Sequence, residues 1–316
     1  MVELYNELIV SSGGVKGVAL IGALNELFRK YPLHNIKYLT GCSVGSIICL
    51  LLNLSYTIEE INNIIFNINF ENFQELKVIN LIEKCGFDEG LKFSNFYKAL
   101  ILNKNINPDI TFKELYDNTN IILTTVAVNT TKGIQEYHNY INTPNMSVVL
   151  ALRMSTNIPV LFSPIIYNDN YYIDGALLDP FPYQYHKNTT KIGLCVLCSY
   201  EYQFLTNNQV EFFNGNNDSF GYIFNLIKIL HANYLKNYFK KIPKNVIYLD
   251  IDLKDDYTNF SLSKNEKKRL FNYGIKKTKI FFNKLFKKRR KLYLAKKYLQ
   301  LWKLKIIINK SLNSIH

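Results

Sequence analysis

The residues with the clearest chemical potential lie in Gly41-Cys42-Ser43-Val44-Gly45, a Gly-x-Ser-x-Gly pattern. This pattern is typical of a nucleophile elbow, a sharp strand-to-helix turn in which the flanking glycines, Gly41 and Gly45, relieve crowding around the serine. The turn points the serine Oγ outward at a helix N-terminus, where the helix dipole favours negative charge. Ser43 is therefore the candidate nucleophile, with an ordinary serine in a glycine turn as the alternative.

A serine nucleophile needs a general base. The usual hydrolase order of serine, acid and then histidine allows His186 or His231 to serve, although neither follows a convincing strand. Asp174 is the better candidate, because it follows the apolar residues 171–173 and precedes Gly175, at which the backbone can turn. This would leave the carboxylate at a strand end. The alternative role for Asp174 is that of a turn-forming residue.

A second glycine-rich loop, Gly13-Gly14-Val15-Lys16-Gly17, lies closer to the N-terminus. Nucleotide-binding loops carry Gly-x-Gly-x-x-Gly or end in Gly-Lys-Ser/Thr, but here Ser12 occupies the first glycine position and the second pattern is missing. Exposed N–H groups of such a loop can instead hold the oxyanion of a tetrahedral acyl intermediate, an effect worth about 3–4 kcal/mol per donor in serine hydrolases.

The segments around these motifs alternate between strands and helices. Apolar segments at 7–10 and 37–40 each lead through a glycine turn into a segment with helical spacing, 18–28 and 47–54. Thr111 and Glu114 have capping-box spacing and predict a helix start. Further strands are expected at 121–128, 134–138, 191–197 and 245–252, a hairpin at 165–173, and helices at 58–70, 94–102, 146–154 and 222–240. Such alternation predicts an α/β sheet with both faces covered.

The three motifs in this order resemble the patatin-like phospholipase family. Its pattern is a Gly-rich oxyanion loop ending in Arg or Lys and then Gly, a Gly-x-Ser-x-Gly elbow, and a late Asp-Gly-Gly or Asp-Gly-Ala, here Asp174-Gly175-Ala176. Residues 151–164 and 172–182 are similar to the family's helix-loop with Ile-Pro and to its Asp-Gly segment with the following Pro turn. The similarity covers about residues 6–200.

The resemblance implies a patatin-like three-layer α/β/α fold with a mostly parallel central sheet. It implies a Ser43–Asp174 dyad without histidine, no metal or cofactor, and cleavage of carboxylic esters of phospholipids or other acyl lipids. Ser12 replaces the first of three glycines and is expected to make its turn with some strain. The oxyanion hole would be formed by Gly13, Gly14 and Val15, and the remaining motif residues would be Lys16, Gly17, Gly41, Gly45, Gly175 and Ala176. A catalytically weak lipid-binding protein with the same fold is an alternative.

Charge is distributed unevenly over the 316 residues. From Lys264 to His316 there are 18 Lys or Arg residues and one acid, Glu266, whereas the preceding 263 residues carry 20 basic and 24 acidic ones. Apolar residues recur in the basic segment at three- and four-residue steps, which predicts an amphipathic helical extension over 264–316. With the family domain at 6–200, residues 201–263 are expected to complete the α/β body. A continuous apolar stripe favours contact with an anionic membrane over nucleic acid, and packing on the domain is a further alternative.

Composition excludes several other classes of protein. With 48% hydrophobic, 14% aromatic and 20% charged residues, the chain is globular rather than disordered or low-complexity. We expect neither a membrane-spanning segment nor a signal peptide, and therefore a cytoplasmic protein that is peripheral to membranes. Five cysteines read as reduced thiols, and Cys195-x-x-Cys198 lies in an apolar strand without the further ligands that a zinc site requires.

Overall fold

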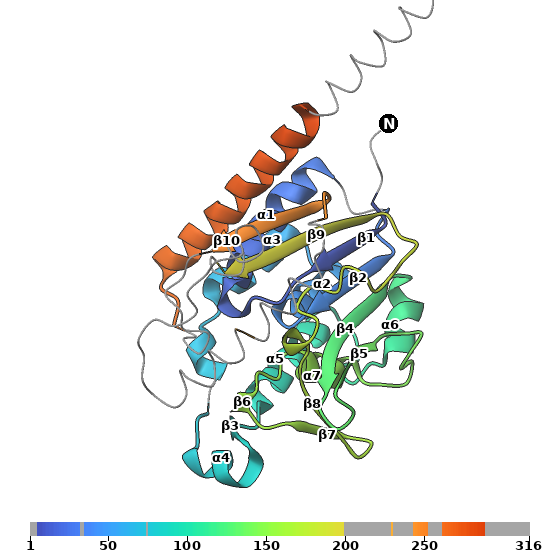
Figure 1. Cartoon of the computed structure of the whole chain (residues 1–316), viewed down its shortest axis with the longest axis vertical. Coiled ribbons are helices and arrows are strands. Elements are labelled where there is room, and N and C mark those ends of the chain that lie inside the picture. The colour runs from blue at the N-terminus through green and yellow to red at the C-terminus, as the bar shows by residue number, and fades with distance from the viewer. Residues whose placement is uncertain are drawn as a thin grey trace, which may run out of the picture.

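The computed structural model describes residues 5–31, 35–73, 75–198, 229, 243–251 and 261–287 (Figure 1). An eight-stranded sheet runs through the centre in the order β10-β9-β1-β2-β4-β8-β7, with β5 also paired to β4. The five parallel strands are β10 (Val246–Ile251), β9 (Lys191–Cys198), β1 (Glu7–Val10), β2 (Tyr38–Cys42) and β4 (Ile122–Asn129). Two strands, β5 (Ile134–His138) and β8 (Asn170–Asp174), pair antiparallel with β4, and β7 (Ile165–Tyr167) pairs antiparallel with β8. The mostly parallel sheet that the sequence predicts is confirmed.

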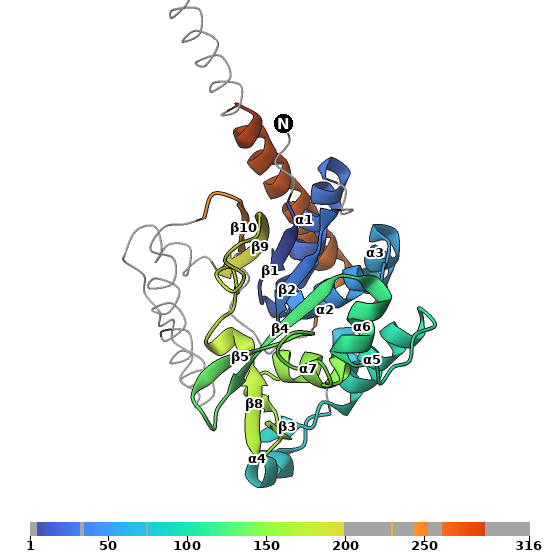
Figure 2. The ribbon, with the colours of Figure 1, turned by 90° about the vertical axis from the view of Figure 1, so that its right-hand side faces the viewer.

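Helices pack on one face of this sheet, as Figure 2 shows from the side. The helices in direct contact with the strands are α1 (Gly17–Lys30), α2 (Val44–Asn53) and α7 (Val148–Ser155). Leu8 and Val10 of β1 point into their shared apolar core. On the other face, Phe181 packs against Ile9 and Cys195. The three-layer α/β architecture is confirmed.

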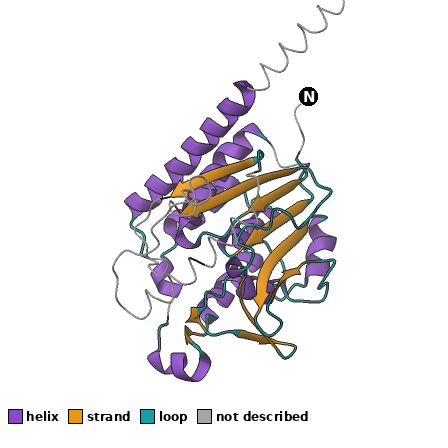
Figure 3. Cartoon of the chain, viewed as in Figure 1, coloured by secondary structure: helices purple, strands orange, loops and turns teal. Residues whose placement is uncertain are grey.

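The remaining elements lie around this sheet, and Figure 3 colours the helices and strands by type. They are α3 (Ile58–Asn67), α4 (Val78–Lys84), α5 (Leu91–Leu102), α6 (Phe112–Thr119), the 3-10 turns η1 (Gly14–Lys16), η3 (Phe70–Phe73) and η4 (Gly175–Leu177), and a small two-stranded sheet of β3 (Gly86–Asp88) and β6 (Val160–Phe162). The predicted capping box at Thr111 and Glu114 is confirmed at the start of α6. Residues 86–88, which the sequence does not mark as a strand, form β3 because β6 supplies a parallel partner from a distant part of the chain.

The basic C-terminal segment begins as a helix over residues 264–287 that packs closely against α1. A Cβ added to Gly274 would lie 2.0 Å from the carbonyl oxygen of Ala19, and one added to Gly22 would lie 2.0 Å from that of Phe271. Leu270 and Phe282 are each only 2% exposed. This part of the extension therefore belongs to the packed body. Of the predicted apolar stripe, Phe281 and Leu285 pack against the core, and the positions after residue 287 lie outside the described residues.

Two further expectations concern parts of the chain that the structure leaves undescribed or covers only in part. The predicted helix at 222–240 and the Asn-rich segment before it lie outside the described residues, apart from Ile229. Among the helices that are described, none is both long and apolar enough to cross a membrane.

Candidate active site

Ser43 occupies the turn between β2 and α2 in a strained backbone conformation. Its φ and ψ are 52° and −125°, which lie outside the regions that a residue with a side chain normally adopts. The turn brings the chain so close to β1 that a Cβ on Gly45 would lie 2.3 Å from the carbonyl oxygen of Val10. The Ser43 N–H donates to Ser155 Oγ at 3.1 Å, and the Ser46 hydroxyl donates to the Ser43 carbonyl at 2.6 Å. The serine is therefore held in this conformation by its neighbours.

Asp174 ends β8 and faces Ser43 across β4. Cys42 pairs with Val126 on one side of β4, and Asp174 pairs with the next residue, Ala127, on the other side. The Ser43 hydroxyl donates to Asp174 Oδ2 at 2.6 Å, and both residues are buried. The register of these two pairings, with β8 antiparallel to β4, therefore brings the Asp174 carboxylate to the Ser43 hydroxyl. The structure thus brings together the nucleophile and the base predicted from the sequence.

The second carboxylate oxygen of Asp174 is also hydrogen-bonded. The Ala176 N–H donates to Oδ1 at 2.8 Å, and the Cys42 thiol lies 3.9 Å from the same atom. Burial, with smaller contributions from Asp174 and Asp179, raises the pKa of Cys42 well above its usual value, so the thiol stays protonated as a weak donor. Asp174 Oδ1 is thereby fixed, and Oδ2 is directed at Ser43.

Asp179 is a further buried acid close to these residues. Burial raises the pKa of Asp179 to about 6, although the Tyr137 hydroxyl donates to its Oδ2 at 2.6 Å. Its own N–H donates to the carbonyl of Gly175, the residue after Asp174. Asp179 therefore closes the turn that begins at the catalytic candidate.

The predicted oxyanion loop lies beside the elbow. Gly14, with φ at +51°, begins the 3-10 turn η1, and a Cβ on Gly17 would lie 2.5 Å from Val44 Cγ2 in the first turn of α2. The first N–H groups of a helical turn have no acceptor within it, so the amides of Gly14 and Val15 are candidates to bind an anion. Lys16 is buried and donates its N–H to the Gly13 carbonyl.

Ser12 does not carry the strain that the sequence led us to expect. The residue with positive φ in this loop is Gly14, and Ser12 is absent from the non-glycine residues with positive φ in the described structure. The Ser12 N–H donates to the Pro180 carbonyl at 2.8 Å, which ties the loop to the segment after Asp174. The Ser11 hydroxyl accepts from the Val196 N–H at 2.9 Å and so ties the loop to β9. Ser12 therefore replaces glycine without distorting the loop.

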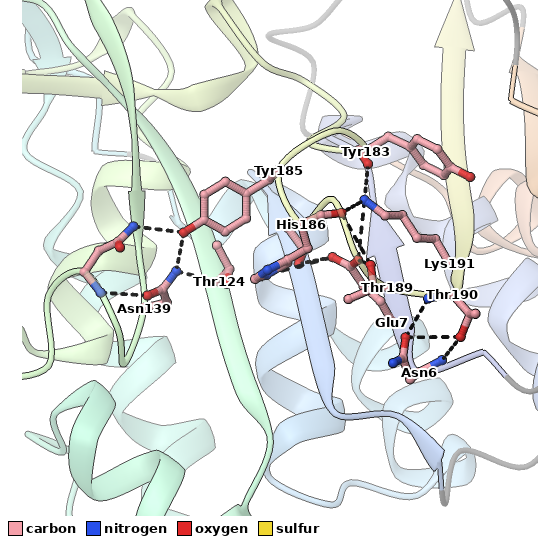
Figure 4. A network of polar contacts seen from close by, with 12 residues as sticks. Asn6, Glu7, Thr124, Asn139, Tyr183, Tyr185, His186, Thr189, Thr190 and Lys191 are labelled. Carbon is pink, nitrogen blue, oxygen red and sulfur yellow. Dashed lines mark hydrogen bonds and ion pairs between the residues drawn. The ribbon is translucent and has the colours of Figure 1, made fainter.

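His186, an alternative base, lies beside Glu7 in the polar network that Figure 4 shows. Its Nε2 is 4.0 Å from Glu7 Oε1 at the first residue of β1. Glu7 pairs with Tyr38, which precedes Ser43 by five positions, or about 16 Å of extended strand. Burial lowers the pKa of His186 to about 4, and Glu7 also accepts from Thr40 at 2.8 Å. This network joins the amino ends of the strands, so His186 is excluded as the base. His231 lies outside the described residues.

Two residues that contact the dyad were not singled out from the sequence. Ser155 accepts from the Ser43 N–H, and the Asn157 carbonyl accepts from the Asp174 N–H at 2.9 Å. Both lie in the 151–164 segment noted for its resemblance to the family. That resemblance was the only signal in the sequence that pointed to them.

Comparisons with known proteins bear on the family of this chain. The sequence model of the family described as Patatin-like phospholipase matches residues 8–185, more than half of the chain. The "probable lipid hydrolase" of Invertebrate iridescent virus 6 is 38% identical over 198 residues, which cover 60% of this chain and 67% of the viral protein. A protein of Acanthamoeba polyphaga mimivirus without an assigned function is 27% identical over 284 residues, covering 86% and 92% of the two chains.

Among solved structures, VipD from Legionella pneumophila shares the fold. It superimposes with a TM-score of 0.59 at 16% sequence identity, covering 89% of this chain and 67% of VipD. At that identity the likeness concerns the fold alone. The family match over residues 8–185 establishes that this chain belongs to the patatin-like phospholipase family.

Proposed function

We propose that the chain is a serine acyl hydrolase that cleaves carboxylic ester bonds of lipids, of the phospholipase A or lysophospholipase type. Membership of a lipid hydrolase family supports the lipid substrate and the hydrolytic reaction. The observation that carries the mechanism is the 2.6 Å hydrogen bond from Ser43 to Asp174 on a strained elbow.

In the first step, Ser43 Oγ attacks the ester carbonyl carbon and its proton passes to Asp174 Oδ2. The carbonyl oxygen becomes an oxyanion, which the amides of Gly13, Gly14 and Val15 would stabilise together with the N-terminus of α2. Collapse of this intermediate breaks the ester C–O bond. The leaving alkoxide takes the proton from Asp174 and departs as an alcohol, so the acyl group remains on Ser43.

In the second step, water replaces the alcohol. Asp174 accepts a proton from the water as its oxygen attacks the acyl-serine carbonyl, and the same oxyanion site is used again. Collapse releases the fatty acid and returns the proton to Ser43. The Asp174 carboxylate can act as the base in both steps because its other oxygen is held by the Ala176 N–H.

The test is an assay of the purified protein on mixed phospholipid vesicles with analysis of the lipid products. Release of fatty acid together with lysophospholipid would support the proposal and identify the acyl position. Binding to vesicles without any product would support the weakly catalytic alternative instead.

We also propose that the basic C-terminal segment contacts anionic membranes. The described helix has one acidic residue, Glu266, and seven exposed basic residues: Lys264, Lys268, Arg269, Lys276, Lys279, Lys284 and Lys287. A cationic surface of this kind is attracted to anionic lipid by about 1 kcal/mol for each base near the membrane. Because the apolar side of the helix packs on α1, this contact would be electrostatic rather than insertion of the described part.

This contact is tested by replacing Lys268, Lys276 and Lys279, which share one helix face, with glutamine. We expect co-sedimentation with phosphatidylserine-containing vesicles to weaken by about 100-fold, and added salt to reproduce part of the loss in the unmodified protein. The matched control replaces the exposed Lys30, Lys37 and Lys113. Tight binding of single-stranded DNA at the same salt, with weak vesicle binding, would favour nucleic acid as the partner.

A further inference from the structure

The turn at the end of α7 contacts both members of the Ser43–Asp174 pair through the backbone. Ser155 Oγ accepts from the Ser43 N–H at 3.1 Å, and the Asn157 carbonyl accepts from the Asp174 N–H at 2.9 Å. Ser155 and Asn157, two residues of one turn, therefore bridge the β2 elbow and the end of β8. A shift of this turn would change the distance between nucleophile and base.

Asn157 fixes the turn from within, and its side chain is fully buried. Its Nδ2 donates to the Ser163 carbonyl at 2.9 Å and to the Tyr172 carbonyl at 3.4 Å. Tyr172 lies two residues before Asp174 in β8. The side chain of Asn157 thus holds the strand that carries the base, while its own carbonyl holds the base directly.

Arg153, one helical turn earlier, holds Asn157 in place. Its Nη2 donates to Asn157 Oδ1 and to the Glu89 carbonyl, both at 3.2 Å. Arg153 is 3% exposed, and its guanidinium carbon lies 5.2 Å from the centre of the Phe162 ring. It also fills the space beside Gly90 at the start of α5, where an added Cβ would lie 1.9 Å from Nη2. The Arg153 guanidinium is therefore anchored to the start of α5, away from the reacting atoms.

We propose that Arg153 and Asn157 are positioning residues that hold Ser43 Oγ and Asp174 Oδ2 at hydrogen-bond distance. This inference rests on the proposed acyl hydrolase function. Neither side chain touches the Ser43 hydroxyl or the Asp174 carboxylate; both act through the backbone of the 155–157 turn. Misplacing catalytic groups by about 1 Å can cost on the order of 100-fold in rate, so a loosened turn should slow acyl transfer more than it weakens substrate binding.

The experiment measures covalent labelling of Ser43 by a fluorophosphonate, together with kcat and KM on a short-chain p-nitrophenyl ester. In Asn157→Ala we expect labelling and kcat to fall by at least tenfold with KM within twofold of the unmodified protein. The matched control is Asn53→Ala. Asn53 is equally buried and donates to a backbone carbonyl, that of Ile121, away from the dyad. Loss of the Asn53 amide should lower the free energy of unfolding without slowing the labelling of Ser43 in the folded protein.

A double-mutant cycle with Arg153→Met separates positioning from independent damage. If both residues act through one turn, the double variant should label little more slowly than the slower single variant. If Asn157→Ala does not fold, Asn157→Asp replaces it, because it keeps the shape and Oδ1 but loses the two N–H donors; labelling should again fall at least tenfold.

The labelling experiment distinguishes failure of the proposed function from failure of the positioning role. If the unmodified protein is not labelled at Ser43 and hydrolyses no ester, the proposed function itself is wrong. If it is labelled but the folded Asn157 variants react as fast as the unmodified protein, or the losses in the cycle add fully, the positioning role is wrong.

Discussion

The hydroxyl oxygen of Ser43 and the Oδ2 atom of Asp174 lie 2.6 Å apart, although 131 positions separate the two residues in the sequence. Strand β4 runs between them and pairs with β2 on one side and with β8 on the other. The pairings of Cys42 with Val126 and of Asp174 with Ala127 place both residues at the same level of β4. The contact is therefore a consequence of sheet register, and the predictions below test what it does.

Replacing Asp174 with asparagine should lower kcat for ester hydrolysis by about 1,000-fold, because the amide keeps the shape but cannot accept the serine proton. The comparison is His186→Ala, which should leave kcat unchanged since His186 lies at the other end of the strands. Steady-state kinetics on a soluble ester measures both. Loss of activity in His186→Ala with activity retained in Asp174→Asn would point to a histidine triad instead.

Gly14→Ala should slow hydrolysis by at least tenfold, because an alanine disfavours φ of +51° and would rotate the amides proposed to bind the oxyanion. Gly133 provides a matched control. It has φ of +68°, and like Gly14 it has no atom within 4 Å of an added Cβ. Both variants should lose about 1 kcal/mol of stability, measured by urea unfolding. Equal activity in the two would show that the Gly14 amides take no part in catalysis.

His138 should make the protein less stable in acid. Burial lowers the pKa of His138 to about 4, so the unfolded chain, with an ordinary value near 6.5, binds the proton more readily between these two pH values. Stability is therefore present above about pH 6.5 and is lost as the pH falls towards 4. In His138→Phe, which keeps a ring beside Tyr172, the drop in unfolding free energy from pH 7 to pH 4.5 should be smaller by about 2 kcal/mol. An identical drop in unfolding free energy in both proteins would show that folding does not lower the pKa of His138.

Gly274→Ala should destabilise the fold by about 1–3 kcal/mol, because the new methyl group would press on the Ala19 carbonyl and push the 264–287 helix away from α1. Thermal unfolding measures the effect. Exposed Asn272→Ala in the same helix serves as the control and should change little. If the two variants are equally stable, the helix does not depend on this contact, and the 264–316 segment acts as a separable extension.

The sequence predicts those features of the fold and site that depend on neighbouring residues. Gly41 and Gly45 flank Ser43 within one turn, and Thr111 caps a helix through Glu114, so both patterns can be read locally. The turn that contacts the dyad could not be predicted in this way, because its hydrogen bonds join residues that are far apart in the sequence. Asn157 donates to the carbonyl of Tyr172, and Arg153 donates to that of Glu89. The pairing of β3 with β6 escaped prediction for the same reason: each strand has three residues, and only the tertiary contact defines it.

The central claim, that Ser43 is the nucleophile of a lipid acyl hydrolase, is tested most directly by fatty acid release from phospholipid vesicles by the unmodified protein and by Ser43→Ala. We expect the unmodified protein to release fatty acid and the variant to release none above background, with the same unfolding temperature to within a few degrees. Turnover retained by Ser43→Ala, on phospholipid or on a p-nitrophenyl ester, would contradict the account.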